Sequence, residues 1–403
     1  KGAVLASVSL LALEASAKVK NNTEGSAPTL SFGGSLTASA IGVKQKQRYN
    51  GPQQTVQSKG NLVVNVSGKA NNGLGYGGLA VLEFDRAKAN HDRISEAYVF
   101  MNHDRFGNIK IGDAEGTEKL MMYSGGDVLG GLGGASGDLN KMITMTRGVD
   151  FTTNIAASND TAPKIVYASP TVHGFQVGLS YTPNTRYYGR FNTNRTISGN
   201  GSISSTASSP YSTNHLAGGL SYNRAFTNTN LGLYLVGVTG KGHGAHENGQ
   251  SNTLFKVKNV NAWQVGTLVD YKNFQLGASY FDKGNSLIKQ GTNWSNTHGV
   301  DVAIGYDFAQ NANAAIGYTH TERKVSNNGK AKADILTATV DYALVPGLVV
   351  FGEFDNFRLR APDAYVTSTT DVASTGADIY ANVPTTNGNN NGQAFIVGTK
   401  VRF

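Results

Sequence analysis

Cysteine is absent from this chain of 403 residues, and charge is scarce. The lack of thiols excludes a disulfide framework and a thiolate metal site. Charged residues make up 15% of the sequence, whereas a soluble domain carries about 25%. Beyond residue 18 there is no apolar run of the roughly 20 residues that a membrane helix needs. A bundle of membrane helices is therefore excluded, and the composition differs from that of an ordinary soluble domain.

Glycine, aromatic residues and a repeating alternation of side chains take the place of what is missing. The chain has 50 Gly, 18 Tyr and 17 Phe, a composition that disfavours helices and suits strands joined by turns. Sixteen segments of about ten residues alternate with a period of two. The first of them sets apolar against polar side chains: Leu30, Phe32 and Leu36 against Ser31, Ser35 and Thr37. The sequence predicts an all-β protein.

The connections between these segments alternate in length. Short turns are expected at 70–74, 103–107, 271–273, 309–312 and 344–347. Long polar segments are expected at 44–60, 114–161, 183–214, 240–257, 282–297, 322–333 and 358–391. Turns at one end and long loops at the other are typical of a barrel inserted into a membrane from one side. Because backbone groups in hydrocarbon must be paired within the protein, the sheet has to close on itself. We therefore predict a sixteen-stranded antiparallel transmembrane β-barrel.

The last segment shows both faces of such a strand. One face carries Phe395, Val397, Thr399, Val401 and Phe403, and the other carries Ala394, Ile396, Gly398, Lys400 and Arg402. Charged side chains are costly in lipid, so the second face is expected to line the lumen. The terminal Phe403 is then expected in an aromatic girdle at one membrane interface.

The first residues resemble an export signal. Lys1 precedes an apolar run from Ala3 to Leu13, and small residues follow at Ala15-Ser16-Ala17. We expect residues 1–17 to be a signal peptide and residues 18–403 to form a single barrel. A frayed first strand is the alternative interpretation of residues 1–17.

Four stretches stand out, in order along the chain. They are Thr29-Leu30-Ser31-Phe32-Gly33-Gly34, Glu96-Ala97-Tyr98-Val99 leading to Phe106-Gly107-Asn108-Ile109-Lys110-Ile111-Gly112, Ile165-Val166-Tyr167-Ala168-Ser169-Pro170 continuing to Gly174-Phe175-Gln176-Val177-Gly178, and Val401-Arg402-Phe403. Together these stretches resemble the general porins of Gram-negative bacteria. The resemblance implies a homotrimer in the cell outer membrane whose third long loop folds inward. It also implies that the assembly machinery of that membrane recognises the last strand, with Val401 and Phe403 as the signal.

The resemblance makes 113–161 the constriction loop. This segment has seven acids and three bases, a net charge of −4 in a chain of +8. A transverse field is expected where an acidic loop faces basic walls across a narrow opening. The predicted constriction residues are Arg93, Lys110, Asp113, Glu115, Glu118, Asp127, Asp138 and Arg147. The family's basic wall is matched only in part, since Ser35, Asn61, Asp113 and Val166 stand where relatives carry bases.

Other kinds of site have little support in the sequence. His243, His246 and Glu247 lie close together but lack a second pair of metal ligands, so no metal or cofactor is expected. The Gly-Gly pairs at 125–126, 130–131 and 133–134 lack the context of a phosphate-binding loop. The basic residues are dispersed without an aromatic groove, which argues against nucleic acid but permits contact with anionic lipopolysaccharide.

Two main functions remain open. One is a water-filled pore for passive diffusion of ions and small hydrophilic solutes, with a weak preference for anions. The other is a surface-binding or structural barrel, an adhesin or antigen, with a plugged lumen. A membrane-embedded hydrolase is a third and more distant alternative. Ser, Thr, Asn and Gly alternate on the expected lumen face, where a plugged core requires larger side chains, so the sequence favours the pore and a protein that is not an enzyme.

Overall fold

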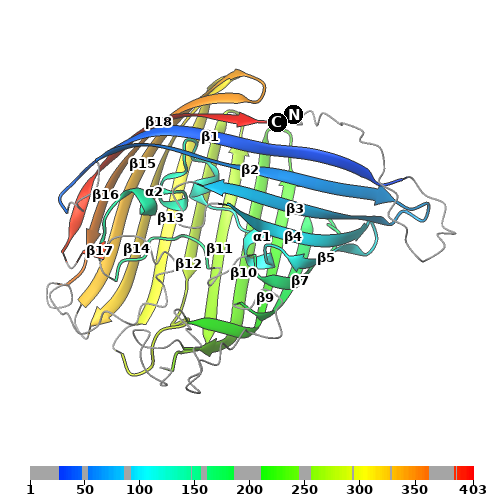
Figure 1. The fold of residues 1–403 in the computed structure, drawn as a ribbon, viewed down its shortest axis with the longest axis horizontal. Coiled ribbons are helices and arrows are strands. Elements are labelled where there is room, and N and C mark those ends of the chain that lie inside the picture. The colour runs from blue at the N-terminus through cyan, green and yellow to red at the C-terminus, as the bar shows by residue number, and fades with distance from the viewer. Residues whose placement is uncertain are drawn as a thin grey trace, which may run out of the picture.

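In the computed structural model the alternating segments form one closed antiparallel barrel (Figure 1). The structure describes residues 27–47, 53–85, 92–146, 148–155, 161–185, 210–244, 256–292, 295–326, 329–362, 385–386 and 388–403. Each barrel strand pairs with its neighbours in sequence, and β1 closes the ring against β18. The predicted sixteen-stranded antiparallel barrel is confirmed.

The described part of the chain contains sixteen barrel strands and one further pair of short strands. The barrel strands are β1 (Thr29–Gln45), β2 (Gln54–Lys69), β3 (Gly75–Asp85), β4 (Asp92–His103), β5 (Gly107–Asp113), β7 (Pro163–Ala168), β8 (Phe175–Asn184), β9 (Tyr211–Ala225), β10 (Thr229–His243), β11 (Val260–Tyr271), β12 (Phe274–Asp282), β13 (Ser295–Ala309), β14 (Ala312–Ser326), β15 (Gly329–Val345), β16 (Leu348–Arg360) and β18 (Asn390–Arg402). The short pair is β6 (Met145–Thr146) and β17 (Thr385–Thr386), which run parallel.

Two of the predicted long connections, 44–60 and 322–333, are wrong because strands occupy most of them. β1 continues to Gln45 and β2 begins at Gln54, while β14 ends at Ser326 and β15 begins at Gly329. Paired strands can continue beyond the lipid, where the outer face no longer has to be apolar. A stretch that is polar on both faces therefore looked like a loop although its backbone stays in the sheet.

The outer face of the barrel is an apolar band with aromatic side chains towards both ends. Exposed aliphatic residues such as Leu235, Ile304 and Leu336 form the band. On β11, Trp263 stands near the loop end and Tyr271 at the turn end, and Phe274 packs on Tyr306 with ring centroids 4.7 Å apart. An apolar band between two girdles is the surface expected of a transmembrane barrel.

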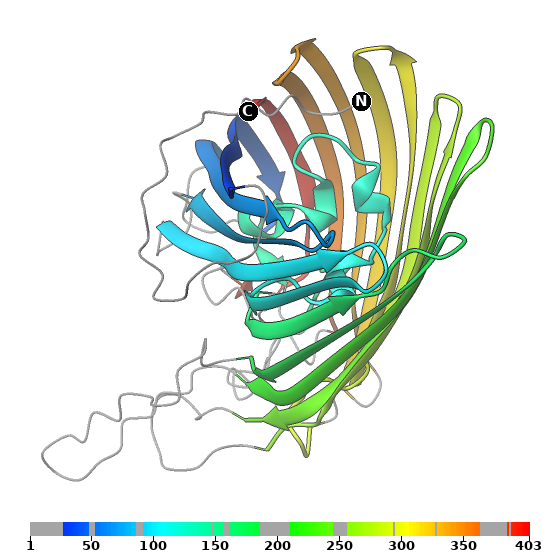
Figure 2. The ribbon, with the colours of Figure 1, turned by 90° about the vertical axis from the view of Figure 1, so that its right-hand side faces the viewer.

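The segment between β5 and β7, residues 114–162, is the third connection at the loop end and is called loop 3 below. It contains all the helices in the described part of the chain: α1 (Thr117–Leu120), η1 (Gly125–Asp127), η2 (Gly134–Ser136) and α2 (Leu139–Met142). In both views of the ribbon these helices lie within the ring of strands (Figures 1 and 2). Loop 3 is therefore folded into the barrel, as predicted.

Among the described residues, no helix has the length and apolarity required to span a bilayer.

Candidate pore constriction

Loop 3 follows the inner wall of one side of the barrel. α1 packs against β7 to β10, η1 against β12 to β14, and η2 against β15. At its start the N–H of Thr117 donates to Ser180 Oγ at 3.1 Å, and towards its end the Thr144 N–H donates to Gln45 Oε1 at 2.9 Å. The loop is therefore attached to the wall from β7 round to β1.

Carboxylates on the inner wall hold the glycine-rich part of loop 3. Glu353 on β16 accepts hydrogen bonds from the backbone N–H groups of Leu132, Gly133 and Gly134 at 2.5, 3.1 and 3.2 Å. Two neighbouring wall residues act in the same way, Asp341 on Gly131 and Asp301 on Gly126. Carboxylates that accept N–H groups form stronger hydrogen bonds than neutral acceptors do.

The glycines of this region are needed for its close approach to the wall. Gly131 and Gly134 both have φ of +55°, a left-handed conformation that side chains disfavour. A Cβ atom on Gly131 would lie 2.4 Å from Glu353 Oε2, and one on Gly134 would lie 2.3 Å from Thr337 Oγ1. The Gly-Gly pairs therefore serve the attachment of loop 3.

Two of the loop acids form ion pairs with bases outside the loop. Asp138 contacts Lys59 on β2 as well as Lys141, which lies 2.6 Å away. Burial alone would raise the pKa of Asp138, but these two ammonium groups lower it below its usual value. This cluster fixes loop 3 to the β2 side of the interior.

The second ion pair joins loop 3 to β14 and to the segment after β12. Asp150 lies 2.9 Å from Lys283 Nζ and 3.6 Å from an Arg323 nitrogen. Burial acts to raise the pKa of Asp150, yet the two cations bring it down to about 2. Burial also lowers the pKa of Lys283, a change that Asp150 opposes. The anchor is therefore ionised at neutral pH.

The remaining predicted acids differ in their surroundings. Glu115 pairs with Lys119 at 2.9 Å, and Glu118, a residue of α1, is 4% exposed. Asp127 is exposed and accepts hydrogen bonds from the N–H and hydroxyl of Ser124 at 2.7 and 3.2 Å. The four predicted acids that lie within loop 3 are thus distributed along its length rather than gathered at one point: Glu115, Glu118, Asp127 and Asp138.

Asp113 and the predicted bases lie elsewhere. Asp113 is the last residue of β5, in register with Ala97 and Pro163. Lys110 lies on the lumen side of β5, opposite in alternation to the exposed Ile109 and Ile111, and its Nζ is 4.9 Å from the centre of the Tyr98 ring.

Two predicted bases cannot be placed as side chains. The backbone of Arg93 pairs with that of Glu83. Arg147 lies outside the described residues. Residues 1–17, His246 and Glu247 also lie outside the described residues. His243 is the last residue of β10, and its ring stacks on that of Tyr211 with the centroids 4.9 Å apart.

Apolar side chains fill the space between loop 3 and the wall, which the sequence did not indicate. The larger cluster joins Leu132, Leu139 and Phe151 of loop 3 to inner-wall residues such as Phe351 and Phe357 of β16. A second cluster packs Met121 against inner-wall residues of β10 and β11. The prediction that small polar side chains line the lumen is therefore wrong for these strands. Loop 3 covers them, and its apolar side chains pack against apolar residues of the wall.

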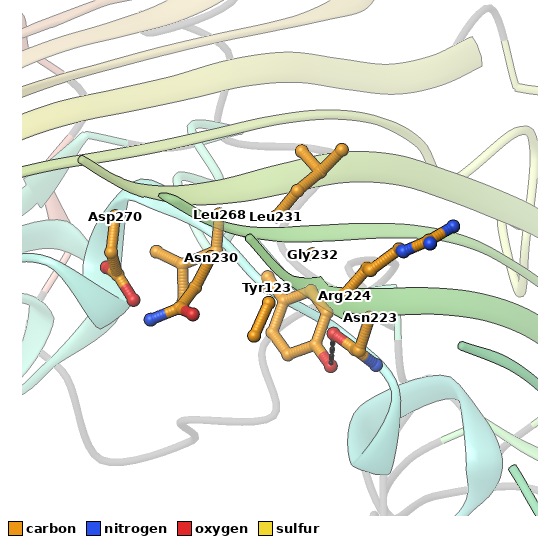
Figure 3. Close-up of a pocket in the computed structure, with 9 residues that line it drawn as sticks. Tyr123, Asn223, Arg224, Asn230, Leu231, Gly232, Leu268 and Asp270 are labelled. Carbon is orange, nitrogen blue, oxygen red and sulfur yellow. Dashed lines mark hydrogen bonds between the residues drawn. The ribbon is translucent and has the colours of Figure 1, made fainter. Parts of the chain in front are cut away.

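Beside α1 and η1 the interior has a hollow of about 300 Å³ (Figure 3). It lies near the turn ends of β9, β10 and β11 and is lined by Tyr123, Asn223, Asn230, Leu268 and Asp270. The Tyr123 hydroxyl donates to Asn223 Oδ1 at 2.9 Å, which fixes this ring of loop 3 to the wall. The lining combines polar side chains with the apolar Leu231 and Leu268.

The predicted assembly residues lie at the seam of the barrel. Val401 and Phe403 are 39% and 60% exposed on the outer side, as the alternation predicts. Phe403 exchanges backbone hydrogen bonds with Gly34 of β1, at 3.0 and 3.2 Å. A Cβ atom on Gly34 would lie 3.0 Å from the Phe403 ring, so this glycine gives the ring room.

Solved structures show the same architecture. OmpT, an outer membrane protein of Vibrio cholerae in a trimer form, aligns with a TM-score of 0.60 at 12% identity, over 94% of this chain and 100% of that one. Salmonella typhi OmpF, in complex with daunomycin, aligns with a TM-score of 0.58 at 16% identity, over 93% of this chain and 98% of that one. At such identities the likeness establishes the fold alone.

Sequence comparison extends this result to family membership. An uncharacterized protein of Rickettsia bellii (strain RML369-C) is 26% identical over 276 residues, which cover 60% of this chain. The chain spans 57% of the length of that relative, a little over half. The family model described as Gram-negative porin matches residues 3–362. With a closed sixteen-stranded barrel and an inward loop, this chain belongs to the Gram-negative porin family and is an outer-membrane β-barrel protein.

Proposed function

We propose that this porin forms a water-filled channel for passive diffusion of ions and small hydrophilic solutes, and that it has no enzymatic activity. The observation that carries the proposal is that, within the part of the chain that the structure describes, loop 3 packs along β7 to β16 and, apart from the Lys59 ion pair, leaves the inner face of β2 to β5 largely uncovered. That face carries Asn61, Lys69, Glu83, Glu96 and Lys110, all at least partly accessible to solvent. Polar side chains that are not buried against a plug are suited to a hydrated path.

The constriction lies, in this proposal, between loop 3 and the wall of β2 to β5. Lys110 and Glu96 stand on the wall, and Glu115, Lys119 and Asp127 stand on the loop. Both signs of charge then face the path, so selectivity is weak. Asp138 and Asp150 serve the attachment of the loop, since each is already neutralised by neighbouring bases.

The homotrimer is part of the same proposal. The outward residues of β1 include Gly34, Ala38 and Ala40, whose small side chains permit close packing between subunits. The trimer form of the Vibrio cholerae neighbour supports this arrangement. Gentle detergent extraction followed by mass measurement tests it, and a monomer under those conditions would contradict it.

Single-channel recording in a planar bilayer is the decisive experiment for the pore. Stepwise conductance that grows in proportion to salt concentration is expected of the purified protein. A barrel that inserts, as shown by heat-modified gel mobility, but carries no current would favour the plugged, surface-binding alternative.

A further inference from the structure

The outer face of the barrel changes character at the loop ends of β14, β15 and β16. Lower on these strands the outward side chains are exposed and apolar, as at Ile316, Leu336 and Val350. Towards the loops the same alternation places charged residues on that face. Five are bases, here called the outer basic belt: Lys324, Lys330, Lys332, Arg358 and Arg360. Two acids, Glu322 and Asp334, lie among them.

The two acids hold part of the belt in position. Glu322 lies 2.5 Å from Lys330 Nζ, 3.4 Å from Lys332 Nζ and 3.1 Å from Nε2 of His298 on β13. Asp334 accepts from an Arg360 nitrogen at 2.6 Å and contacts His320 Nδ1 at 2.8 Å.

Asp334 also connects the belt to the aromatic girdle. The Tyr318 hydroxyl donates to Asp334 Oδ1 at 2.8 Å. Girdle aromatics stand at the interface between lipid tails and headgroups. The belt therefore begins at the level of the lipid headgroups, where charges cost little.

The strand register places like charges directly opposite each other in the belt. Lys324 faces Lys330 across β14 and β15, and Lys332 faces Arg360 across β15 and β16. Such cross-strand pairs destabilise a sheet. The two acids stand opposite the other neighbours, Glu322 opposite Lys332 and Asp334 opposite Arg358. Two carboxylates do not neutralise five bases, and Lys324 and Arg358 form no ion pair in the part of the chain that the structure describes. The arrangement becomes favourable when an external anion lies between the paired bases.

We propose that the outer basic belt binds the phosphate groups of anionic lipids in the outer leaflet, with Lys332 and Arg360 as one pair of phosphate donors. Ammonium and guanidinium groups are strong donors to phosphate oxygens, and negative lipids attract bases close to the membrane surface. The side chains of Lys330, Lys332 and Arg360 are 53%, 39% and 47% exposed, so they are open to such a ligand.

The same end of β10 to β12 provides a contrast. Within the strands β10 to β12 as the structure describes them, the outward charges beside Trp263 and Tyr280 are Lys241 and Asp282, one base and one acid. These described strands therefore present no excess of positive charge to the lipid. The lipid site is accordingly expected on one side of the barrel rather than around its whole rim.

Heat unfolding of the full protein in vesicles tests the proposal. The midpoint is measured in phosphatidylcholine with and without phosphatidylglycerol, for wild type and for Lys332→Gln/Arg360→Gln. The matched control is Lys241→Gln/Lys256→Gln, which removes two bases outside the belt: Lys241 lies on β10, and Lys256 is an exposed residue of the segment that precedes β11. We expect phosphatidylglycerol to raise the midpoint of wild type and control, and the belt variant to lose at least half of that rise. An equal rise in all three proteins would overturn the proposal.

A second belt variant and inorganic phosphate serve as further tests of the lipid site. Lys324→Gln/Arg358→Gln keeps every ion pair of the belt given above, so it tests the site should the first variant fold poorly, and it too should lose part of the rise. Inorganic phosphate added to phosphatidylcholine vesicles should leave the midpoint unchanged. Stabilisation by inorganic phosphate equal to that by the lipid would assign the site to free phosphate and overturn the lipid proposal. Conductance in neutral bilayers tests the channel separately.

Discussion

The inner wall of the barrel has two regions that differ in the side chains they carry and in how far loop 3 covers them. Under loop 3, on β10 and on β15 to β18, the inward residues include large apolar side chains and a carboxylate that accepts loop N–H groups, as at Tyr234, Phe357 and Glu353. On β2 to β5, where loop 3 makes fewer contacts in the described part of the chain, Asn61, Glu83 and Lys110 face the interior with partial exposure. The difference shows that one side of this lumen is built as a protein core and the other as a solvated surface.

Among the contacts that hold loop 3 against the wall it covers, the ion pairs of Asp150 with Lys283 and Arg323 should matter most. Asp150→Asn leaves Lys283 and Arg323 without their buried carboxylate, and loss of one partner of a buried ion pair costs about 3–5 kcal/mol. Loop 3 should then detach locally and move over the uncovered wall, so the single-channel current should flicker. Asp127→Asn is the control in the same loop, because its carboxylate is exposed. Steady currents in Asp150→Asn would show that the anchor does not hold the loop.

The same anchor predicts a pH dependence. The pKa of Asp150 is about 2 in the folded protein, against about 3.9 in an unfolded chain. A lowered pKa stabilises the fold above the unfolded value, and the stabilisation is lost as the pH falls through the folded one. The difference in unfolding midpoint between wild type and Asp150→Asn should be constant above about pH 5 and should shrink towards pH 2. A difference that grows on acidification would contradict this assignment.

Removing a wall carboxylate should have the next largest effect. Glu353→Ala takes away the acceptor of three loop N–H groups, and each buried donor left unpaired costs about 1–3 kcal/mol unless water replaces the carboxylate. We expect a loss of about 3 kcal/mol and faster proteolysis within 130–137. Glu83→Ala is the control on the uncovered wall. Equal protease sensitivity in the two variants would remove the distinction between the walls.

The seam between β18 and β1 closes the barrel within the wall that loop 3 covers. Phe403→Ala removes an aromatic ring that lies over Gly34 and is 60% exposed, so the loss of packing is about 1–2 kcal/mol. We expect less heat-modifiable barrel in the outer membrane while export is unaffected. Val397→Ala, on the same face of the same strand, is the control. Equal yields from both variants would argue against a special role of Phe403 in assembly.

The smallest effect concerns ion selectivity on the uncovered wall. Lys110→Gln should move the reversal potential towards cations and Asp127→Asn towards anions. A partly exposed charge contributes only about 0.2–1 kcal/mol, so permeability ratios should change on the order of twofold. The effects should fall further as the Debye length shortens to about 3 Å at 1 M salt. Reversal potentials that neither substitution moves would place the constriction elsewhere.

The sequence by itself determined the barrel. Period-two alternation, turns of fixed position and the amphipathic strand that ends in Phe403 follow from local chemistry, because each strand must show an apolar face to lipid wherever it lies in the ring. The same rule placed Val401 and Lys400 on opposite faces. It failed at 44–60 and 322–333, where the strands leave the lipid and both faces are polar.

Only the tertiary structure decided which charges line a path and which hold the loop. Asp138 and Asp127 look alike in sequence, yet the first is paired with Lys59 from β2 and the second is exposed. Glu353 and Asp301 gave no local signal, because their partners are backbone N–H groups of loop 3, more than 170 residues away in sequence. Pairing across such distances is fixed by barrel closure and by the path of loop 3, and no local pattern encodes either.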